Sequence, residues 1–337
     1  MPRAKKQIGC ALVGYGPAFN MGRLHGNSIN ENPGLRVVAA CDTDPARLEA
    51  AAADFPGIET YPDLQSLLKS EAVGLCVVIL PHHLHGPVGL RCLQGGKHVV
   101  LEKPMCLTTK EAKAMVDTAR AAGLMLSVFH NRRWDGDYLA LRQAVAAGLV
   151  GDIFEVEMWM GSYGHPGSRW RSKKEISGGA FYDWGAHFLD WLLQLMNEPV
   201  VNVTGFYHKR VWHDVSNEDH VQAVIRFASG AMANVQQSSI AHHNLPWWRV
   251  LGTEGALVAA KGGFDYYTRH EGVAVKGFVP DLHSDWDAYY RDVAAHLLRG
   301  KALTVKPEQA ARVIGIIEAA EKSSKSGKAE ALPGWLA

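Results

Sequence analysis

The sequence has few cysteines and no surplus of charge of either sign, and each shortage excludes a class of protein. The 337 residues contain only five cysteines, none in a C-x-x-C pattern: Cys10, Cys41, Cys76, Cys92 and Cys106. An odd number without a pairing pattern argues against a disulfide framework, so we expect reduced thiols and a cytoplasmic protein. Lys and Arg total 35 against 34 for Asp and Glu, a net charge of +1. This balance argues against a nucleic-acid partner, which needs a basic surplus.

Long apolar runs are also missing. No stretch approaches the roughly 20 apolar residues that a membrane helix needs, so we expect no membrane partner. The apolar run 8–13 follows the basic residues Arg3, Lys5 and Lys6. It is short and leads into a glycine turn, so we do not interpret it as a secretion signal.

The first half of the chain alternates between apolar runs and helical segments. The runs are typical of strands buried on both faces; they span residues 8–13, 35–41, 74–80, 97–101 and 124–129. Strands that alternate with helices predict a doubly wound parallel sheet, and therefore an α/β fold. The length of 337 residues favours a second domain.

The turn after the first run carries a phosphate-binding signal. Gly14 and Gly16 fit the start of the dinucleotide fingerprint G-x-G-x-x-G, but Phe19 takes the third position and Gly22 comes three residues late. Pro17 has no N–H to offer a phosphate. We therefore predict a lengthened turn in which the cofactor contacts come from Gly14, Gly16, Phe19, Asn20 and Met21. A glycine-rich loop without a ligand is the alternative.

Asp42 ends the second strand, where an acid can accept from both hydroxyls of an adenosine ribose. The same carboxylate would repel a 2′-phosphate, which favours NAD over NADP as the cofactor. A turn or cap aspartate is the alternative, but Asp44 is the better-placed cap before Pro45.

Two further groups of polar residues stand in apolar surroundings. Lys103, within Glu102-Lys103-Pro104, follows a strand and should point toward the ligand side of the sheet. A loop lysine that is simply solvated is the alternative. Asp183 and His187 are four residues apart in a segment that we predict to be a helix opened by Gly178 and Gly179, so both would share one face. A core histidine paired with its carboxylate neighbour is the alternative. We expect Asp190 to be structural.

The second half predicts an antiparallel sheet. Its strands are expected at residues 153–160, 200–207, 220–227, 231–239 and 247–251. A polar face at Asn234, Gln236 and Ser238 is either an oligomer interface or solvent-exposed. Final helices are expected at 286–298 and 307–322, followed by a surface tail.

Taken together, these motifs resemble the Gfo/Idh/MocA (glucose–fructose oxidoreductase / inositol dehydrogenase) family over nearly the whole chain. The resemblance rests on Gly14-Tyr15-Gly16 with Gly22 and His25, Asp42, Pro81-His82-His83-Leu84-His85, Glu102-Lys103-Pro104 and Gly178-Gly179…Asp183-Trp184-Gly185-Ala186-His187. It implies a Rossmann domain, residues 1–128, and an α+β domain with an open, mostly antiparallel sheet, residues 129–337. The final helix would pack back near the Rossmann domain.

The resemblance also implies roles. Lys103, Asp183 and His187 would be catalytic, with His187 as the acid/base. Pro81, His82, His85 and Glu102, together with Lys103, would complete the cofactor site. Arg133, Tyr163 and Trp170, together with Asp183 and His187, would bind substrate, although for Arg133 a salt bridge at the domain junction is the alternative.

The expected reaction is hydride transfer between NAD, less favourably NADP, and a hydroxyl-bearing carbon of a sugar, polyol or inositol. The alternatives are a redox-neutral NAD-dependent glycosidase or eliminase, a reductase of an imine or dihydrodiol, and a non-catalytic dinucleotide-binding regulator. The family's open sheet implies a homodimer or homotetramer. Histidines at 82, 83, 85, 242 and 243 lack an acid or cysteine at ligand spacing, so we predict no metal.

Overall fold

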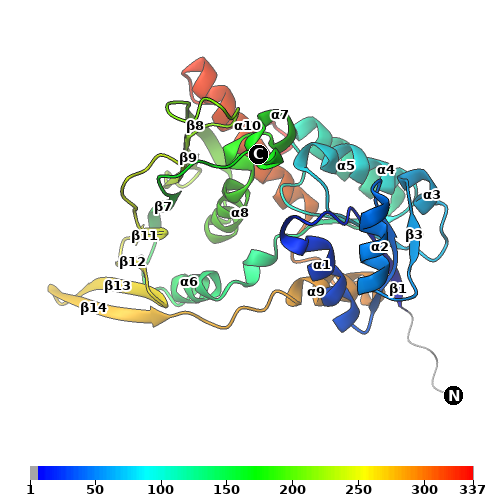
Figure 1. The fold of residues 1–337 in the computed structure, drawn as a ribbon. Helices are drawn as coiled ribbons and strands as arrows, with labels where there is room; N and C mark the ends of the chain where they lie inside the picture. Colours follow the sequence, from blue (N-terminus) through cyan, green and yellow to red (C-terminus); the bar gives the residue numbers. More distant parts are fainter. Residues whose placement is uncertain (1–6, 337) are drawn as a thin grey trace. The chain divides into compact units, whose positions relative to one another are not determined.

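The computed structural model describes residues 7–336, which fall into two compact units (Figure 1). The first unit comprises Met1–His130 and Asp287–Ala310, and the second comprises Asn131–Trp286 and Ala311–Ala337. The basic residues Arg3, Lys5 and Lys6 lie outside the described part. The expected boundary at residue 128 stays a prediction.

The first unit is built on a six-stranded sheet in the order β3-β2-β1-β4-β5-β6, in which every neighbouring pair is parallel. Its strands are β1 (Ile8–Val13), β2 (Leu35–Cys41), β3 (Glu59–Tyr61), β4 (Leu75–Val78), β5 (His98–Leu101) and β6 (Leu126–Val128). The strand order reverses between β1 and β4, which is the point where ligands bind in open α/β sheets. The predicted doubly wound parallel sheet is confirmed.

Helices fill the connections of this unit: η1 (Ala18–Asn20), α1 (Met21–Glu31), α2 (Pro45–Asp54), α3 (Leu64–Leu68), α4 (His82–Gln94), α5 (Thr109–Ala122) and α9 (Ala288–Arg299). Local chemistry explains their ends. Asp44 caps α2 by accepting from the N–H of Ala46 ahead of Pro45, as predicted. The α4 helix begins at His82 and contains Pro87 in its interior.

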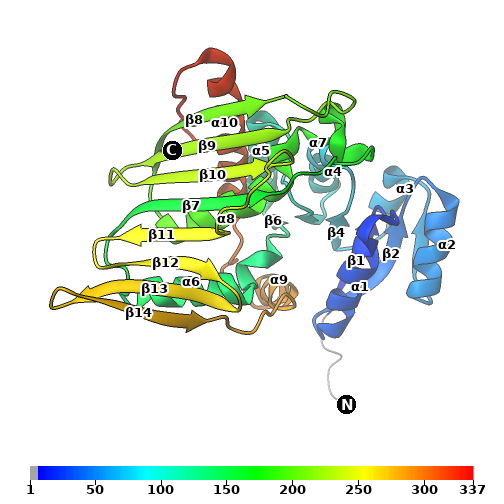
Figure 2. The same cartoon turned by 60° about the vertical axis from the view of Figure 1, so that its left-hand side comes forward.

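The second unit carries an eight-stranded sheet in the order β14-β13-β12-β11-β7-β10-β9-β8 (Figure 2). Its strands are β7 (Ile153–Gly161), β8 (Val200–His208), β9 (His220–Phe227), β10 (Met232–Ser238), β11 (Trp248–Gly252), β12 (Gly255–Ala260), β13 (Gly263–His270) and β14 (Val273–Pro280). All neighbours are antiparallel except β7 and β10, so the expected open, mostly antiparallel sheet is confirmed. Sequence analysis missed β12, β13 and β14.

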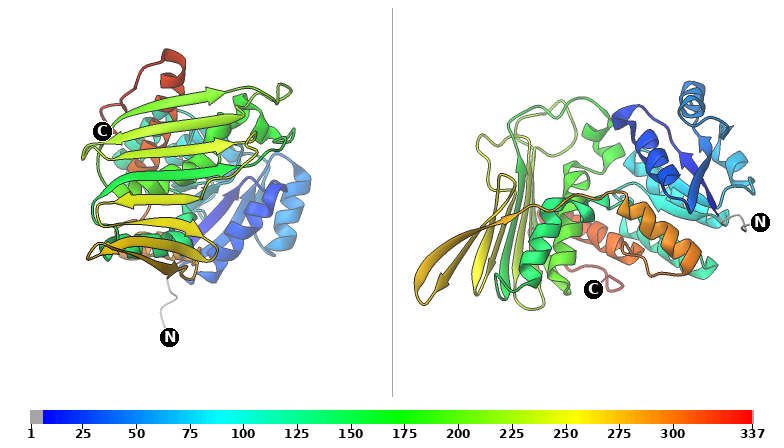
Figure 3. Two further views of the ribbon diagram at one scale, coloured as in Figure 1. Left: turned by 90° about the vertical axis from the view of Figure 1, so that its left-hand side faces the viewer. Right: turned by 90° about the horizontal axis from the view of Figure 1, so that it is seen from below.

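Helices cover one face of this sheet (Figure 3). They are α6 (Gly136–Ala146), α8 (Trp184–Met196) and α10 (Pro307–Ser326), with η2 (Asn131–Trp134), η3 (Trp170–Ser172), α7 (Lys174–Ser177) and η4 (Ala180–Tyr182) in the connections. The strands also expose large apolar side chains, among them Phe154, Val201, Phe206 and Phe278. The predicted oligomer through this sheet and the cytoplasmic location stay predictions. Within residues 7–336, no helix is long and apolar enough to cross a membrane.

Two expectations for the second unit were wrong. The helix predicted to open at Gly178 begins instead at Trp184, because Gly178 and Gly179 adopt positive φ angles of 87° and 129°, which an α-helix does not allow. The predicted surface tail is partly packed: Glu330 pairs with Val203 of β8, and Leu332 and Leu336 are buried. Their apolar side chains gain more from contact with the protein than from exposure to water.

Candidate functional site

The turn after β1 presents a helix N-terminus that no protein side chain caps. Gly14 has a φ of 96°, and a Cβ on it would lie 2.2 Å from the carbonyl oxygen of Ile79. Phe19 and Asn20 both adopt positive φ angles, and α1 then begins at Met21 with no acidic residue in its first turn and no side-chain cap. Free backbone N–H groups and the helix dipole make such an end suited to a phosphate.

Gly16 and Gly22 have different roles in this turn. A Cβ on Gly16 would meet nothing within 4 Å, so the backbone there is open to a ligand. A Cβ on Gly22 would lie 2.5 Å from the Tyr15 ring. The late glycine therefore allows close packing between helix and turn, as the third glycine of the fingerprint does.

Asp42 is bonded directly to the glycine turn. Its carboxylate accepts from the N–H of Tyr15 at 2.7 Å and from the N–H of Asp44 at 3.0 Å. A hollow next to this turn is lined in part by Arg23, Arg47 and Asp54. Both arginines have acidic partners, since Arg23 pairs with Asp54 and Arg47 lies 3.5 Å from Asp44. The arginines therefore add no unbalanced positive charge beside Asp42.

The loops after β4 and β5 are linked by His85. This ring is fully buried, with Nδ1 2.6 Å from the carbonyl oxygen of Pro104 and Nε2 2.7 Å from that of Leu80. Burial lowers the pKa of His85, and the two carbonyl oxygens raise it by less, so the net shift is downward. In this position His85 supports the two loops. Pro81 occupies the N-cap position of α4 without a side-chain hydrogen bond, and His82, the first residue of α4, is buried.

Glu102 lies next to Lys103 at the end of β5 and belongs to a buried chain of hydrogen bonds. Burial raises the pKa of Glu102, but the hydrogen bond and charge of His25 and the charge of Lys103 lower it more, and the net shift is downward. The carboxylate therefore accepts, from Nε2 of His25 at 2.9 Å and from the N–H of Lys103 at 3.0 Å. The other ring nitrogen of His25, Nδ1, lies 2.7 Å from the hydroxyl of Tyr290, so the chain of hydrogen bonds runs from Glu102 through His25 to Tyr290.

Sequence analysis gave no role to His25 or Tyr290. The hydrogen bond between them joins residues 265 positions apart, which no local pattern reveals. A signal did exist for His25, because it lies with Gly22, Gly26 and Ile29 on the buried stripe of α1.

In the second unit, Arg133 and Asp190 form a buried bidentate ion pair. Nε and Nη2 of Arg133 donate to the two oxygens of Asp190 at 2.8 and 2.6 Å, and both side chains are almost fully buried. This agrees with the structural role expected for Asp190. The predicted substrate contact of Arg133 stays a prediction. The guanidinium of Arg132 lies 4.6 Å from the centre of the Trp184 ring and is 28% exposed.

Asp183 and His187 lie at the start of α8. Asp183 occupies the N-cap position, with φ and ψ both −83°, rather than the first helical face. Its carboxylate is one-third exposed and 3.9 Å from Nε of Arg171. His187 is buried in the first turns of the helix, beside the Trp184 ring with the ring centres 5.4 Å apart. An acid at a helix N-terminus is stabilised by the helix dipole.

The predicted substrate aromatics lie in separate surroundings. Tyr163 stacks on His242 with ring centres 4.1 Å apart and also contacts Trp212. Trp170 lies in η3, under the guanidinium of Arg171 at 4.4 Å. Among residues 7–336, no group of three or more histidine, cysteine, aspartate or glutamate side chains could hold a metal ion.

Comparison with known proteins matches both parts of the chain. Residues 8–130 match the model described as "Oxidoreductase family, NAD-binding Rossmann fold", and residues 138–258 match the "GFO/IDH/MocA C-terminal domain". The scyllo-inositol 2-dehydrogenase (NADP(+)) of Bacillus subtilis is 30% identical over 304 residues, covering 83% of this chain and 85% of the relative.

Two other similar proteins extend the comparison. The scyllo-inositol 2-dehydrogenase (NAD(+)) of the same organism is 26% identical, covering 85% of this chain and 82% of the relative. The solved structure of an NAD-binding protein from Listeria innocua superposes with a TM-score of 0.87 at 25% identity, covering 98% and 99% of the two chains. The chain is an oxidoreductase that belongs to the Gfo/Idh/MocA family.

Proposed function

We propose that this oxidoreductase transfers a hydride between NAD and a hydroxyl-bearing carbon of a sugar, polyol or inositol. The observation that carries the proposal is the arrangement of the first unit. The uncapped start of α1 and the loop with Lys103 follow β1 and β5 of one parallel sheet, whose strand order reverses between β1 and β4. Ligands of such sheets bind beyond the carboxyl ends of the strands at this reversal.

The residues of the glycine turn fit a dinucleotide. Gly14, Gly16 and the first N–H groups of α1 would hold the pyrophosphate, and Asp42 would accept from the adenosine ribose. When bound, the nicotinamide supplies a hydride acceptor. Lys103 would stabilise negative charge on the substrate oxygen, and Glu102 holds its backbone by accepting from the N–H of Lys103.

In the second unit, His187 would accept the proton of the substrate hydroxyl, because a neutral imidazole nitrogen can act as a general base. Asp183, at the exposed start of α8, would orient the substrate or the imidazole. The names of the relatives support the substrate class, since two are scyllo-inositol dehydrogenases and another is a 1,5-anhydro-D-fructose reductase.

The reaction is tested by NADH absorbance with scyllo-inositol, myo-inositol and D-glucose. We expect at least one to reduce NAD⁺, and we expect Lys103→Ala and His187→Ala each to lower kcat/KM by roughly 100-fold or more. Near-full turnover in either variant would show that its residue is not catalytic. Product formation without net NADH would instead indicate the redox-neutral reaction.

Cofactor preference is a separate test, because the two Bacillus relatives are named for different cofactors. We propose NAD, since Asp42 is acidic and Arg23 and Arg47 already have acidic partners. We expect NAD⁺ to bind more tightly than NADP⁺, and Asp42→Ala to narrow the difference in Kd. Tighter binding of NADP⁺ to the unmodified protein would overturn this assignment.

A further inference from the structure

The turn that leads into α8 has an unusual backbone. Gly178 and Gly179 have φ angles of 87° and 129°, and Asp183 has φ and ψ of −83°. Two consecutive glycines have no side chains that could pack and hold the turn. The conformation of the turn therefore depends on contacts from other segments. The direction of the Asp183 side chain and the start of α8 both depend on this backbone.

Those contacts come from residues 216–219, which directly precede β9. Glu218 Oε2 accepts from the N–H of Ala180 at 3.0 Å. The side chain of Asn217 accepts at 3.1 Å from the hydroxyl of Ser177, which itself accepts from the N–H of Gly179 at 3.2 Å. Two consecutive N–H groups of the turn are therefore held, one directly and one through Ser177.

The same four residues also hold the segment before the turn. Asn217 donates to the carbonyl oxygen of Arg171 at 2.6 Å, and Ser216 accepts from the N–H of Lys174 at 2.7 Å. Arg171 is the residue whose guanidinium lies 3.9 Å from Asp183. The segment that leads up to Asp183 is thus tied at several points, between residues 171 and 180, to one short segment.

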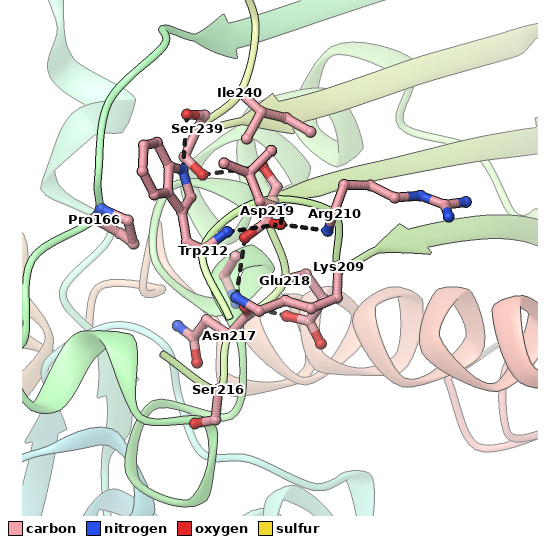
Figure 4. A network of polar contacts seen from close by, with 12 residues as sticks. Pro166, Lys209, Arg210, Trp212, Ser216, Asn217, Glu218, Asp219, Ser239 and Ile240 are labelled. Carbon is pink, nitrogen blue, oxygen red and sulfur yellow. Dashed lines mark hydrogen bonds and ion pairs between the residues drawn. The ribbon is translucent and has the colours of Figure 1, made fainter. Parts of the chain in front are cut away.

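Residues 216–219 are fixed in turn by the network shown in Figure 4. The buried carboxylate of Asp219 accepts from the N–H of Val211 at 2.7 Å and from Nζ of Lys209 at 3.0 Å. Lys209 also donates to the carbonyl oxygen of Asn217 at 2.6 Å. Backbone and ammonium donors to an ionised acid make strong hydrogen bonds, so this segment is a firm support.

Glu218 is itself held in place. Its side chain is 9% exposed and pairs with Lys174, which lies 3.0 Å from Glu321 of α10. A Cβ on Gly179 would lie 2.8 Å from Glu218 Oε2. Two features therefore favour glycine at position 179: its φ angle and the Glu218 carboxylate that packs against it.

We propose that Glu218 is a positioning residue for the reaction, acting through the N–H of Ala180 on the turn that carries Asp183 and begins α8. The proposal rests on the proposed function, in which Asp183 and His187 act on the substrate. Neither Glu218 nor Asn217 was singled out by the sequence, because the Glu218 bond spans 38 positions.

Amide hydrogen exchange tests the contact without a substrate. In Glu218→Ala we expect faster exchange at residues 179–184, because the N–H of Ala180 loses its acceptor. In Glu218→Gln we expect protection to return, because the amide oxygen can still accept. Glu198→Ala is the matched control: Glu198 accepts from the N–H of Ser229 at 2.8 Å, in the same unit but outside this turn. Unchanged exchange in Glu218→Ala would overturn the proposal.

Kinetics with NAD⁺ and scyllo-inositol test the positioning role. We expect Glu218→Ala to lower kcat by about 10- to 100-fold with an unchanged KM for NAD⁺, and Glu218→Gln and Glu198→Ala to stay within about threefold of the unmodified protein. If Glu218 acts through the Asp183 turn, Asp183→Ala/Glu218→Ala should be no slower than Asp183→Ala alone.

The outcomes separate the two proposals. Multiplied losses in the double variant, or an unchanged kcat in Glu218→Ala, would overturn the role of Glu218. A fully active Asp183→Ala variant would contradict the role of Asp183 in the proposed function, and it would also overturn the positioning role of Glu218, which acts through Asp183.

Discussion

The two proposed reacting regions are supported by different physical means. Around Lys103 the support is charge: Glu102 is a buried, ionised carboxylate that accepts from His25 and from the backbone of Lys103. Around Asp183 the support is backbone conformation: a glycine turn with positive φ angles is held by Glu218 and Asn217. A charge-held site should fail when charge is removed without a change of shape. A backbone-held site should fail when a Cβ is added or an acceptor is lost.

The ion pair between Arg133 and Asp190 is the strongest test of this comparison, because it is a buried charge pair in the unit whose reacting region is held by backbone conformation. We expect Asp190→Ala to lower the free energy of unfolding by about 3–5 kcal/mol, because it leaves the guanidinium of Arg133 buried without its carboxylate. Urea denaturation would measure the loss. The double variant Arg133→Met/Asp190→Leu removes both charges and should cost less than Asp190→Ala. A loss below about 1 kcal/mol in Asp190→Ala would show that the pair carries little stability.

The direct comparison is between two isosteric substitutions. We expect Glu102→Gln to lower the free energy of unfolding by about 1.5–3 kcal/mol, because a neutral amide replaces the ionised carboxylate that accepts from His25 and from the N–H of Lys103. We expect Glu218→Gln to lower the free energy of unfolding by less than about 1 kcal/mol. The amide oxygen can still accept from the N–H of Ala180, and Lys174 still pairs with Glu321. Urea denaturation of both variants checks the order, and the reverse order would contradict the distinction between the two regions.

Gly179→Ala should affect the backbone-held region alone. We expect the free energy of unfolding to fall by about 1–3 kcal/mol. One cause is the φ of 129° at this position, and the other is the added Cβ, which would lie 2.8 Å from Oε2 of Glu218. In the Glu218→Ala background the cost should be smaller, since one of the two causes is gone. Thermal unfolding of the unmodified protein, the two single variants and the double variant Gly179→Ala/Glu218→Ala measures both costs. An equal cost in both backgrounds would assign the whole effect to the φ angle.

The smallest expected effect is the pH dependence that His85 adds to the first unit. Burial lowers its pKa in the folded protein, so below about pH 6.5 the unfolded chain binds a proton that the folded chain resists. The free energy of unfolding should therefore fall as the pH drops through this window, by at most about 1.4 kcal/mol per pH unit. Urea denaturation at about pH 7.5 and 5.5 gives the change in the free energy of unfolding between the two pH values. This change should be smaller in His85→Gln than in the unmodified protein. An equal difference would mean that other histidines, such as His98 and His220, dominate.

Much of the first unit could be predicted because its signals are local. Continuous apolar runs identified five of the six strands but not the short β3, and Asp44 with Pro45 fixed the start of α2, since a cap and its helix are neighbours in sequence. The start of α8 could not be placed in this way. Apolar residues surround Asp183 on both sides, and the turn is separated from the helix by the φ angles of Gly178 and Gly179 and by the non-helical φ and ψ of Asp183.

The sequence by itself determined the parallel sheet, the family and the residues most suited to bind a dinucleotide, because strand burial and glycine turns leave short-range patterns. Only the tertiary structure decided what supports those residues. Tyr290 reaches His25 across 265 positions, Arg133 reaches Asp190 across 57 and Glu218 reaches Ala180 across 38. Buried donors and acceptors must be paired, but the partner is whichever group the fold brings within about 3 Å, and that choice is made by packing rather than by sequence spacing.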